Sequence, residues 1–434
     1  MEIRDYVPLA RTNHRGLGET FGILGADRLH HVYVIGKTGT GKSTLLRNIV
    51  LRDIVEGRGV GLIDPHGNLA EELLSYIPRQ RLEGVGGNDV IYFDPSDVEY
   101  PIGFNLLDDV SPLRRDLVAS AVVSAFKSIW SDAWGASTED LLRNSVLTLM
   151  ENPGSTLLGV PRLLKEPEFR KRMVWRVRNL EVRRFWEEEY ARYDAGYREQ
   201  KIAPLLNKVR TLLSTDILRN ILGQPRSGFS IREVVDQGKI FIANLSKGKL
   251  GEDKTALLGS LLVAAFGNAA LSRASEDRSL DSFRRFYLAV DEFHSFTTES
   301  FATILSEARK YGLALTLAHQ FIDQLAPPVR SAVFGNVGTL ICFRVGNTDA
   351  VPLAQEFAPE FEEEDLVNLP NHKMVLKLMI HGQASRAFSA TSLPPLREER
   401  RRTAHTVAQT RRRLARPKAA VEERLRRWLR ERST

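Results

Sequence analysis

The stretch GKTGTGKST, from Gly36 to Thr44, limits the possible folds of this chain more than any other part of its sequence. An apolar run, HVYVIG, leads into it, and STLLRNIVLRDI follows with its apolar residues at helical spacing. This order predicts a buried strand, a Gly-rich loop and then a helix. Strand, loop and helix in that order are the context in which such a loop binds phosphate groups.

The residues of this loop are suited to a nucleoside triphosphate. Glycines let backbone N–H groups converge on phosphate oxygens, and the helix N-terminus adds a partial positive charge. We expect Lys42 to reach the β- and γ-phosphates of ATP and Ser43 to ligate Mg²⁺. The expected nucleotide-binding residues are Gly36, Thr38, Gly39, Thr40, Gly41, Lys42, Ser43 and Thr44.

An acidic pair supplies the catalytic groups that such a loop requires. Asp291 and Glu292 directly follow an apolar run, Phe286 to Val290, and open α/β sheets bind ligands at the carboxyl ends of their strands. We expect Asp291 to hold the Mg²⁺ and Glu292 to act as the general base for the attacking water. Asp64 ends another apolar run, GVGLI, and is either a nucleotide-side residue or part of a structural turn.

The stretch SEARKYGLALTLAHQ carries two further candidates. Gln320 ends a predicted strand next to the acidic pair, where its side chain could contact both the γ-phosphate and a neighbouring element. Arg309 ends a predicted helix, where it could act as an arginine finger on an adjacent subunit. The alternative for Arg309 is a surface cation favoured by the helix dipole.

Further apolar runs predict the fold class. Several are apolar at consecutive positions, as strands buried on both faces are, and helical segments alternate with them. The sequence therefore predicts an α/β, RecA-like P-loop fold with a mostly parallel sheet. The runs are KIFIANLS, LALTLAHQ, GTLICFRVG and KMVLKLMIHG, at 239–246, 313–320, 338–346 and 373–382.

The region between the two halves of this fold reads as helical throughout. Its amphipathic patterns predict an inserted all-α domain, rich in Arg, Lys and Trp, which is either a docking face for DNA or a partner, or a set of solvated helix faces. The expected domains are 1–109 and 233–395 for the two parts of the RecA-like domain, 110–232 for the all-α insertion and 396–434 for a basic tail.

Most of the net charge lies in that tail. From Leu396 onward there are fourteen Arg or Lys and five Asp or Glu, so the tail carries +9 and the rest of the +7 chain carries −2. We expect a flexible or marginally helical arm with one apolar helical face, formed by Val421, Leu425, Trp428 and Leu429. This face is either solvated or docks on a partner, an acidic lipid surface or DNA. DNA bound by the body would then require a local basic patch.

Cysteine usage and hydropathy indicate the compartment. A single cysteine cannot form an internal disulfide, which fits a reducing cytosol. The most apolar stretch, from Thr255 to Ser272, is short for a membrane span and is interpreted as a buried core helix. We expect a cytoplasmic chain without its own transmembrane segment, recruited to the inner face of a membrane by an anchored or secretion-system partner.

Seven motifs in order resemble the HerA/FtsK superfamily, and within it the ATPase domain of type IV secretion coupling proteins of conjugative DNA transfer. They are GKTGTGKST, LIDPHGNLAEELL, PIGFNLL, IANLSKGKLGED, AVDEFHSF, SEARKYGLALTLAHQ and FRVGNTDA. The resemblance covers residues from about 28 to about 392. It implies the roles expected above for Lys42, Ser43, Asp291, Glu292 and Gln320.

The resemblance also implies an arginine that acts on a neighbouring subunit. Arg309 matches that element, and Arg28 and Arg344 are weaker candidates for a second finger or a sensor. The sequence thus predicts an ATP-driven DNA translocase that works as a ring, a homo-hexamer in the simplest case. The alternatives are a protein-secretion or pilus-assembly ATPase of the same superfamily, and a nucleotide-binding scaffold that does not hydrolyse ATP.

Overall fold

The computed structural model describes residues 5–13, 18–83, 89–108, 110–276, 282–396 and 402–430. The chain forms two compact units, each of which is made from several segments. Unit 1 comprises 1–93, 231–246 and 269–407, and unit 2 comprises 94–230, 247–268 and 408–434.

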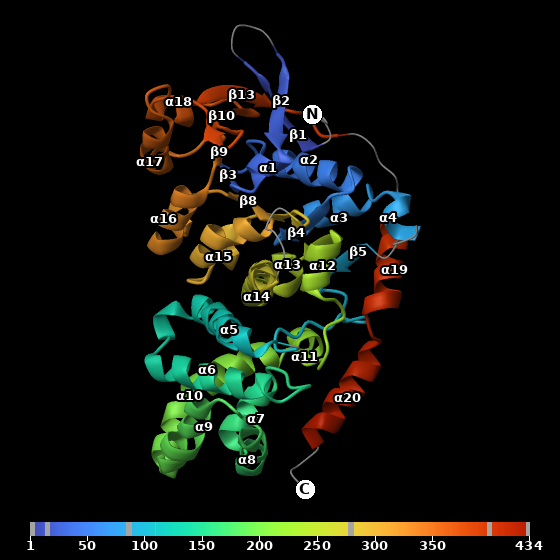
Figure 1. Ribbon diagram of the computed structural model, residues 1–434, viewed down its shortest axis with the longest axis vertical. Coiled ribbons are helices and arrows are strands. Elements are labelled where there is room, and N and C mark those ends of the chain that lie inside the picture. The colour runs from blue at the N-terminus through green and yellow to red at the C-terminus, as the bar shows by residue number, and fades with distance from the viewer. Residues whose placement is uncertain are drawn as a thin grey trace. The chain divides into compact units, whose positions relative to one another are not determined.

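An 11-stranded sheet forms the centre of unit 1, in the order β2-β1-β13-β10-β9-β3-β8-β7-β4-β6-β5 (Figure 1). From β9 to β5 the strands are parallel, which confirms the predicted mostly parallel α/β fold. The parallel strands are β3 (Val32–Ile35), β4 (Gly59–Asp64), β5 (Val90–Phe93), β6 (Ile240–Asn244), β7 (Phe286–Val290), β8 (Leu313–His319) and β9 (Thr339–Cys342).

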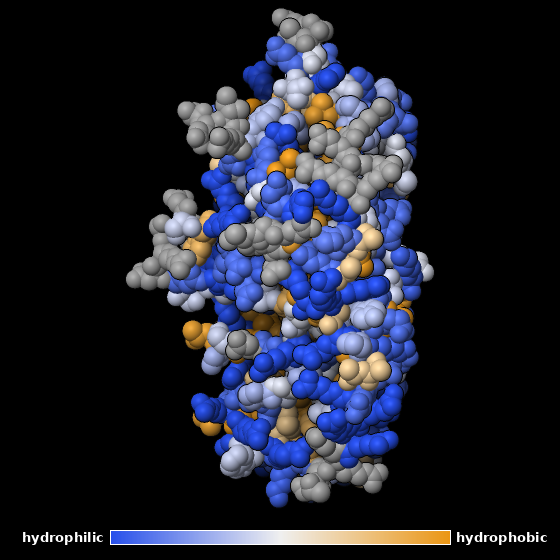
Figure 2. Space-filling model, turned by 90° about the vertical axis from the view of Figure 1, so that its right-hand side faces the viewer, coloured by the Kyte–Doolittle hydropathy of each residue, from blue (hydrophilic) through white to orange (hydrophobic). Residues whose placement is uncertain are grey.

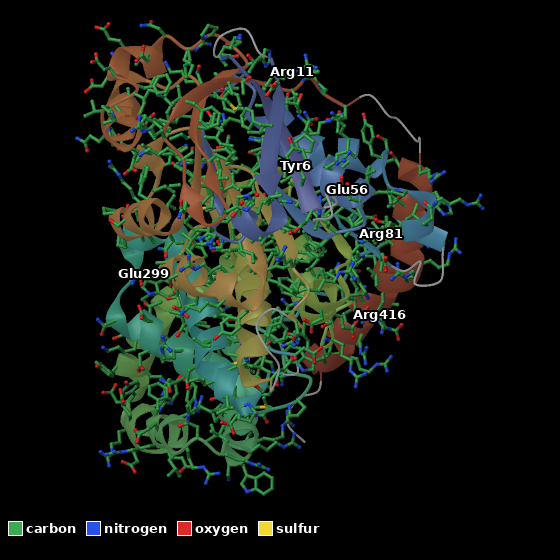
Figure 3. All side chains as sticks on the ribbon, turned by 45° about the horizontal axis from the view of Figure 1, so that its top comes forward. Tyr6, Arg11, Glu56, Arg81, Glu299 and Arg416 are labelled. Carbon is green, nitrogen blue, oxygen red and sulfur yellow. The ribbon has the colours of Figure 1, made fainter. Side chains whose placement is uncertain are left out.

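An antiparallel extension adds four strands beside β9. They are β1 (Tyr6–Thr12), β2 (Thr20–Leu24), β10 (Lys373–Lys377) and β13 (Phe388–Ser392), and β11 (Met379–Ile380) pairs separately with β12 (Gln383–Ala384). Tyr6 and Arg11 mark β1 in Figure 3. None of the motifs that predicted the nucleotide site belongs to this extension.

Helices cover both faces of the parallel strands. As a result, five of these strands are buried at every position, namely β3, β4, β6, β7 and β8. Helix α2 buries Leu45 and Ile49, as its apolar spacing predicts. The helices of unit 1 are α1 (Gly25–Arg28), α2 (Lys42–Val55), α3 (Asn68–Leu74), α4 (Arg79–Glu83), α12 (Ile231–Gln237), α15 (Phe301–Glu307), α16 (Pro327–Asn336), α17 (Asn347–Phe357) and α18 (Glu363–Val367).

The described part of unit 2 is built from helices. Two helices, α14 (Glu252–Leu271) and α19 (Thr403–Leu414), pass from one unit into the other. The others are α5 (Arg115–Ile129), α6 (Ala136–Met150), α7 (Gly159–Lys165), α8 (Pro167–Trp175), α9 (Leu180–Arg184), α10 (Ala195–Leu213), α11 (Asp216–Leu222), α13 (Lys247–Leu250) and α20 (Lys418–Arg430). An all-α unit therefore accompanies the P-loop fold.

The basic tail is more ordered than the arm expected from its composition. Helix α20 buries Val421 and Leu425 in unit 2, and the Arg162 guanidinium lies 4.8 Å from the centre of the Trp428 ring. Leu429, expected on the same face, is instead 53% exposed. Arg416, just before α20, is labelled in Figure 3, and Figure 2 shows a mainly hydrophilic surface on the side that carries this helix.

Helix α14 contains the most apolar stretch of the sequence. Among the described residues, one helical segment, Glu252–Ser275, is long and apolar enough to cross a membrane, and 78% of its most apolar window is buried inside the protein. Leu258, Leu262 and Phe266 are fully buried. Burial of this kind agrees with the core helix that the sequence predicted.

Candidate nucleotide-binding site

The carboxyl edge of the parallel sheet collects most of the predicted site residues. The Gly-rich loop follows β3, the acidic pair follows β7, and Gln320 follows β8. These three strands are neighbours in the order β3-β8-β7, so their ends meet at one place. This edge is where open α/β sheets bind ligands.

The backbone of the Gly-rich loop leaves no space for side chains at two of its glycines. A Cβ added to Gly36 would lie 2.6 Å from the Cβ of Phe343, and one added to Gly41 would lie 3.0 Å from Cε1 of the same ring. Gly41 also has a positive φ of 125°. Helix α2, which begins at Lys42, has no side-chain N-cap, so its first N–H groups remain available to an anion.

Lys42 points into the loop. Its side chain is buried, and its Nζ donates to the carbonyl oxygen of Gly36 and, at 3.1 Å, to that of Lys37. Burial lowers the pKa of Lys42, while the carboxylates of Glu292 and Asp291 oppose this shift. A buried ammonium group beside an uncapped helix end is well suited to bind the phosphates of a nucleotide.

Three side chains, each from the segment that follows a different strand, form a hydrogen-bonded chain across the site. Thr38 Oγ1 donates to Gln320 Oε1 at 2.9 Å, and Gln320 Nε2 donates to Glu292 Oε1 at 2.7 Å. Glu292 has a left-handed backbone, with φ 44° and ψ 48°, and strain of this kind is concentrated at functional sites. Gln320 therefore connects the phosphate-binding loop to the expected general base.

The other carboxylate oxygen of Glu292 is left without a hydrogen bond. Its Oε2 is buried and has no such partner among the described residues, and His294 Nδ1 lies 3.4 Å away. A buried carboxylate oxygen in this state is costly unless a water or a ligand satisfies it. Glu292 is thus placed to accept a proton from a water molecule at the same edge.

Asp291 lies among other carboxylates. Its backbone N–H donates to Ile63 O at 3.1 Å, which places the aspartate between the ends of β4 and β7. Burial raises the pKa of Asp291 to about 6, and the neighbouring carboxylates of Asp64 and Glu292 add to this shift. The positive charge at this edge therefore does not offset the burial of Asp291 and the charge of its acidic neighbours.

These residues fit a bound Mg²⁺. The ion prefers oxygen ligands, usually one or two carboxylates together with waters and phosphate oxygens, and it would supply the missing positive charge. Asp291 and Ser43 would hold it, since Ser43 is exposed at the first turn of α2. When bound, the metal would neutralise charge on the phosphates.

Asp64 has a structural task in the turn that follows β4. Its two carboxylate oxygens accept hydrogen bonds from the backbone N–H groups of His66, at 2.8 Å, and Ala70, at 2.9 Å. Both atoms are occupied in this way, so the turn interpretation of Asp64 is the better supported one. Its charge still reaches the site through Asp291.

Arg309 is not at this edge of the sheet. It lies in the 3₁₀ turn Ala308–Tyr311, which precedes β8, whereas Gln320 follows the same strand. The seven residues of β8 separate them by roughly 20 Å. Arg309 is exposed, and its Nη1 lies 3.1 Å from Nδ1 of His30.

The two weaker arginine candidates differ from Arg309. Arg28 is buried, with its two Nη atoms 2.7 and 2.8 Å from the Asp53 carboxylate and its guanidinium 3.8 Å from the centre of the Tyr287 ring. It is therefore a structural residue and cannot be a finger. Arg344 follows β9, its carbonyl accepts from the N–H of Lys37 at 2.8 Å, and its side chain donates to Asn371 at 2.9 Å. Arg344 thus lies beside the loop of its own chain.

Two residues that contact the loop were not identified from the sequence. Phe343 packs on both glycines described above, and the N–H of His372 donates to Thr40 O at 2.9 Å. His372 has a positive φ of 65° and an exposed side chain. Phe343 begins the motif FRVGNTDA, in which only Arg344 was a candidate, and His372 lies in none of the seven motifs. The pairing of β9 with β3 and β10 brings both residues here.

A comparison with known families decides the classification. A sequence profile described as the DNA-binding domain of type IV secretion-system coupling proteins matches residues 25–374. The chain belongs to this family. The resemblance inferred from the motifs is thereby confirmed, and the coupling-protein family accounts for most of both units.

Solved structures share the fold of this coupling-protein family member. The plasmid coupling protein TrwB in complex with the non-hydrolysable ATP analogue ADPNP is 18% identical, with a TM-score of 0.60 and 87% of each chain covered. TrwB in complex with ADP and Mg²⁺ is 17% identical, with a TM-score of 0.62, and the match covers 87% of this chain and 88% of TrwB. VirB4 of Thermoanaerobacter pseudethanolicus is 17% identical, with a TM-score of 0.53, and the match covers 89% and 96%. A search of curated protein sequences gave no match.

Proposed function

We propose that this chain hydrolyses ATP and uses the energy to move DNA through a ring of identical subunits, a hexamer in the simplest case. One observation carries the proposal. Lys42, Glu292 and Gln320 lie at the carboxyl edge of the sheet, whereas Arg309 lies exposed at the opposite edge. If Arg309 acts in hydrolysis, its distance from the site of its own chain requires that it act on the site of another copy.

Each residue of the site has a task in hydrolysis. The loop and Lys42 would bind the phosphates, and Ser43 and Asp291 would hold Mg²⁺. Glu292, oriented by Gln320, would take a proton from the attacking water. The TrwB structures with an ATP analogue and with ADP and Mg²⁺ support these ligands for a chain with the same fold.

The neighbouring copy would complete the site. Arg309 would stabilise the charge that develops on the transferred phosphoryl group, which is worth 10³- to 10⁵-fold in rate in related enzymes. The interface must be heterologous, because the amino edge of one copy meets the carboxyl edge of the next, and such interfaces close into rings. Hydrolysis in one subunit would then depend on the position of its neighbour.

DNA is the proposed load. The description of the family as a DNA-binding domain supports it. A motor that advances along DNA has to hold it through its phosphates, because base contacts would make each step depend on sequence. We propose a cytoplasmic location at the inner face of a membrane, with a secretion-system partner as the recruiting factor.

The test measures ATP turnover by the oligomeric protein without DNA, with single-stranded DNA and with double-stranded DNA. We expect at least one form of DNA to stimulate turnover, and the Lys42→Ala variant to remain inactive under every condition. No stimulation by either form, in a preparation shown by light scattering to be oligomeric, would contradict DNA transport. That result would favour a motor that moves protein with the same site.

A further inference from the structure

A loop joins α8 to α9 in unit 2 (Figure 1), and a tryptophan at its start is exposed. Trp175 ends α8 and is 78% exposed, and Leu180, which begins α9, is 77% exposed. Tryptophan carries a large apolar ring and is highly buried in most folded proteins. An indole that is held in solvent therefore indicates a contact surface.

Backbone hydrogen bonds hold this loop in one conformation. The buried carboxylate of Glu151 accepts from the N–H of Arg178 at 2.6 Å and from that of Asn179 at 3.3 Å, and it forms an ion pair with Arg115 at 3.4 Å. Asn179 caps α9 by accepting from the N–H groups of the two residues after Leu180. The loop is thus anchored through its main chain, and its side chains stay available.

A second contact fixes the main chain at Trp175. Arg183 Nη2 donates to the carbonyl oxygen of Trp175 at 3.2 Å, so the end of α8 is tied to α9. The main chain that carries the indole therefore does not have to be ordered when a ligand arrives. Preorganisation of this kind lowers the entropy cost of binding.

The guanidinium groups of this loop have no acidic partners. Arg176 and Arg178 are exposed, and neither side chain forms an ion pair with any residue in the described part of the chain. The arginines of α9 differ, because Arg183 lies 3.9 Å from Glu187 and Arg184 lies 3.3 Å from Glu188. Lys171 and Arg172 of α8 are also exposed and have no ion pair among the described residues, so the unpaired positive charge extends from the end of α8 into the loop.

The loop borders a hollow of about 1080 Å³ in unit 2. Four arginines and two acids line it: Glu151 bonds to the loop and to Arg115, and Asp116 is exposed. Trp175, Arg176 and Arg178 all line this hollow. A partner that binds here meets an aromatic face next to two free cations.

We propose that Trp175, Arg176 and Arg178 form a binding site for single-stranded DNA. The indole would stack on one unpaired base, and the two guanidinium groups would bind the flanking phosphates. In a duplex the bases are already stacked on one another, so this site would prefer single strands. The inference rests on the proposed function, since DNA is the proposed load, and it adds the strandedness that the motor residues leave open.

Charge and composition favour DNA over a protein partner. Between Trp175 and Leu180 the exposed residues are Arg176, Arg178 and Asn179, all of them polar, so the two apolar side chains form no continuous patch. Protein interfaces have well-packed apolar centres from which charged residues are depleted. An isolated ring flanked by cations instead matches the platforms on which bases stack.

The test is a binding titration of the full-length protein without nucleotide, read by the fluorescence anisotropy of a labelled oligothymidylate. Trp175→Ala should weaken binding by about 5- to 100-fold, because stacking on one base contributes about 1 to 3 kcal/mol. Trp175→Phe should retain most of the affinity, because phenylalanine also offers a flat ring. Neither substitution should change the affinity for a duplex of the same length.

The arginines are tested through the salt dependence of binding. Arg176→Gln with Arg178→Gln should weaken binding and reduce the slope of log affinity against log salt concentration by about 1 to 2. Arg184→Gln is the matched control, since Arg184 is equally exposed on the adjacent helix but paired with Glu188. This control should leave the slope within about 0.5 of that of the wild type.

Two outcomes would overturn the site. One is that the Trp175→Ala variant binds the oligonucleotide with wild-type affinity. The other is that the variant loses affinity equally for single strands and for the duplex. If Trp175→Ala binds the oligonucleotide normally but loses binding to polyglutamate, the surface belongs to an acidic protein. In each case, DNA-stimulated ATP turnover by the wild type would preserve the proposed motor, whereas its absence would remove the motor itself.

Discussion

The two edges of the parallel sheet in unit 1 are equipped differently. At the carboxyl edge, Lys42, Glu292 and Gln320 are linked to the Gly-rich loop by hydrogen bonds and are at least partly buried. At the amino edge, Arg309 is exposed, and the hydrogen-bond partner of its side chain among the described residues is His30. The first edge holds the proposed hydrolytic site, and the second presents Arg309 beside Lys310, which is paired with Glu307.

This difference shows what one copy of the chain lacks. Phosphoryl transfer requires positive charge at the transferred phosphoryl group, and Lys42 is a buried cation beside the carboxylates of Asp291 and Glu292. Mg²⁺ would supply part of that charge. We propose that a guanidinium from the amino edge of a second copy supplies the rest, which would make the activity a property of a ring.

The largest effect is expected at the amino edge. Arg309→Ala should lower ATP turnover by about 10³-fold or more, while the affinity for ATP stays within a few-fold of the wild type. Turnover is measured with a coupled assay and affinity with a fluorescent ATP analogue. Lys310→Ala is the control, since Lys310 is the adjacent exposed cation, paired with Glu307 at 2.8 Å. Equal losses of ATP turnover in both variants would mean that Arg309 has no catalytic role that Lys310 lacks.

At the carboxyl edge, Glu292→Gln should lower turnover by about 10²- to 10⁴-fold, because the general base is lost. The substituted amide can still bond to Gln320, so the fold and ATP binding should persist. Single-turnover measurements separate this loss from slow product release. A variant that turns over ATP at the wild-type rate would reassign the chain as a scaffold or give the base role to another residue.

A contrast between two arginines sharpens the comparison. Arg28→Met should lower the free energy of unfolding by about 3 to 5 kcal/mol, because it leaves the buried Asp53 carboxylate poorly compensated. Arg309→Ala should leave the unfolding curve unchanged. Urea denaturation followed by circular dichroism measures both. A stable Arg28→Met protein would mean that Arg58, 3.2 Å from Asp53, compensates for the loss.

The smallest effect concerns the segment that carries Arg309. His31 is buried, with its Nε2 2.9 Å from Leu305 O and its Nδ1 accepting from the N–H of Leu315 at 3.1 Å, so the ring is neutral and protonated on Nε2. Burial lowers the pKa of His31 to about 4. The unfolded chain, with a pKa of about 6.5, therefore binds a proton more readily than the folded chain as the pH falls.

Stability should thus be lost as the pH falls from 6.5 toward 4. Protonation of His31 should lower the free energy of unfolding by about 2 kcal/mol between pH 7 and pH 5. Urea midpoints of the wild type and of His31→Gln at both pH values measure this share. The variant should be less stable at pH 7 but should show a smaller change with pH, and equal changes in the two proteins would contradict the assignment.

Much of the sheet could be predicted from the sequence, because its central strands are buried on both faces and read as unbroken apolar runs. The run from Phe286 to Val290 matches β7 residue for residue, and β8 differs from its predicted run at one end only. Strand β1 was missed because Pro8 interrupts its pattern, and the structure accommodates it where the register with β2 shifts.

The site residues also divide into those that could be predicted from the sequence and those that could not. Lys42, Asp291, Glu292 and Gln320 could be predicted because each lies in a motif at the end of its own strand. Phe343 and His372 could not, since their contacts with the loop depend on which distant strands pair with β3 and β9. The roles given to all these side chains in catalysis stay predictions, as do the domain boundaries drawn from the sequence.

Composition alone also misled about the C-terminal region. Its arginine blocks are typical of a solvated arm, yet Val421 and Leu425 of α20 are buried in unit 2. The apolar spacing was visible in the sequence, but the surface that covers it is built from residues more than a hundred positions away, among them Gly223, whose added Cβ would lie 3.0 Å from the Leu425 side chain. Helix docking of this kind cannot be inferred from local pattern.

Mixing two inactive variants tests the central claim most directly. Arg309→Ala and Lys42→Ala are coexpressed, and the ATP turnover of the mixed oligomers is compared with that of each variant alone. If a guanidinium from one copy completes the site of the next, random mixing at equal amounts should restore roughly a quarter of the wild-type turnover. No recovery at any ratio, in oligomers shown to contain both variants, would contradict a site shared between subunits.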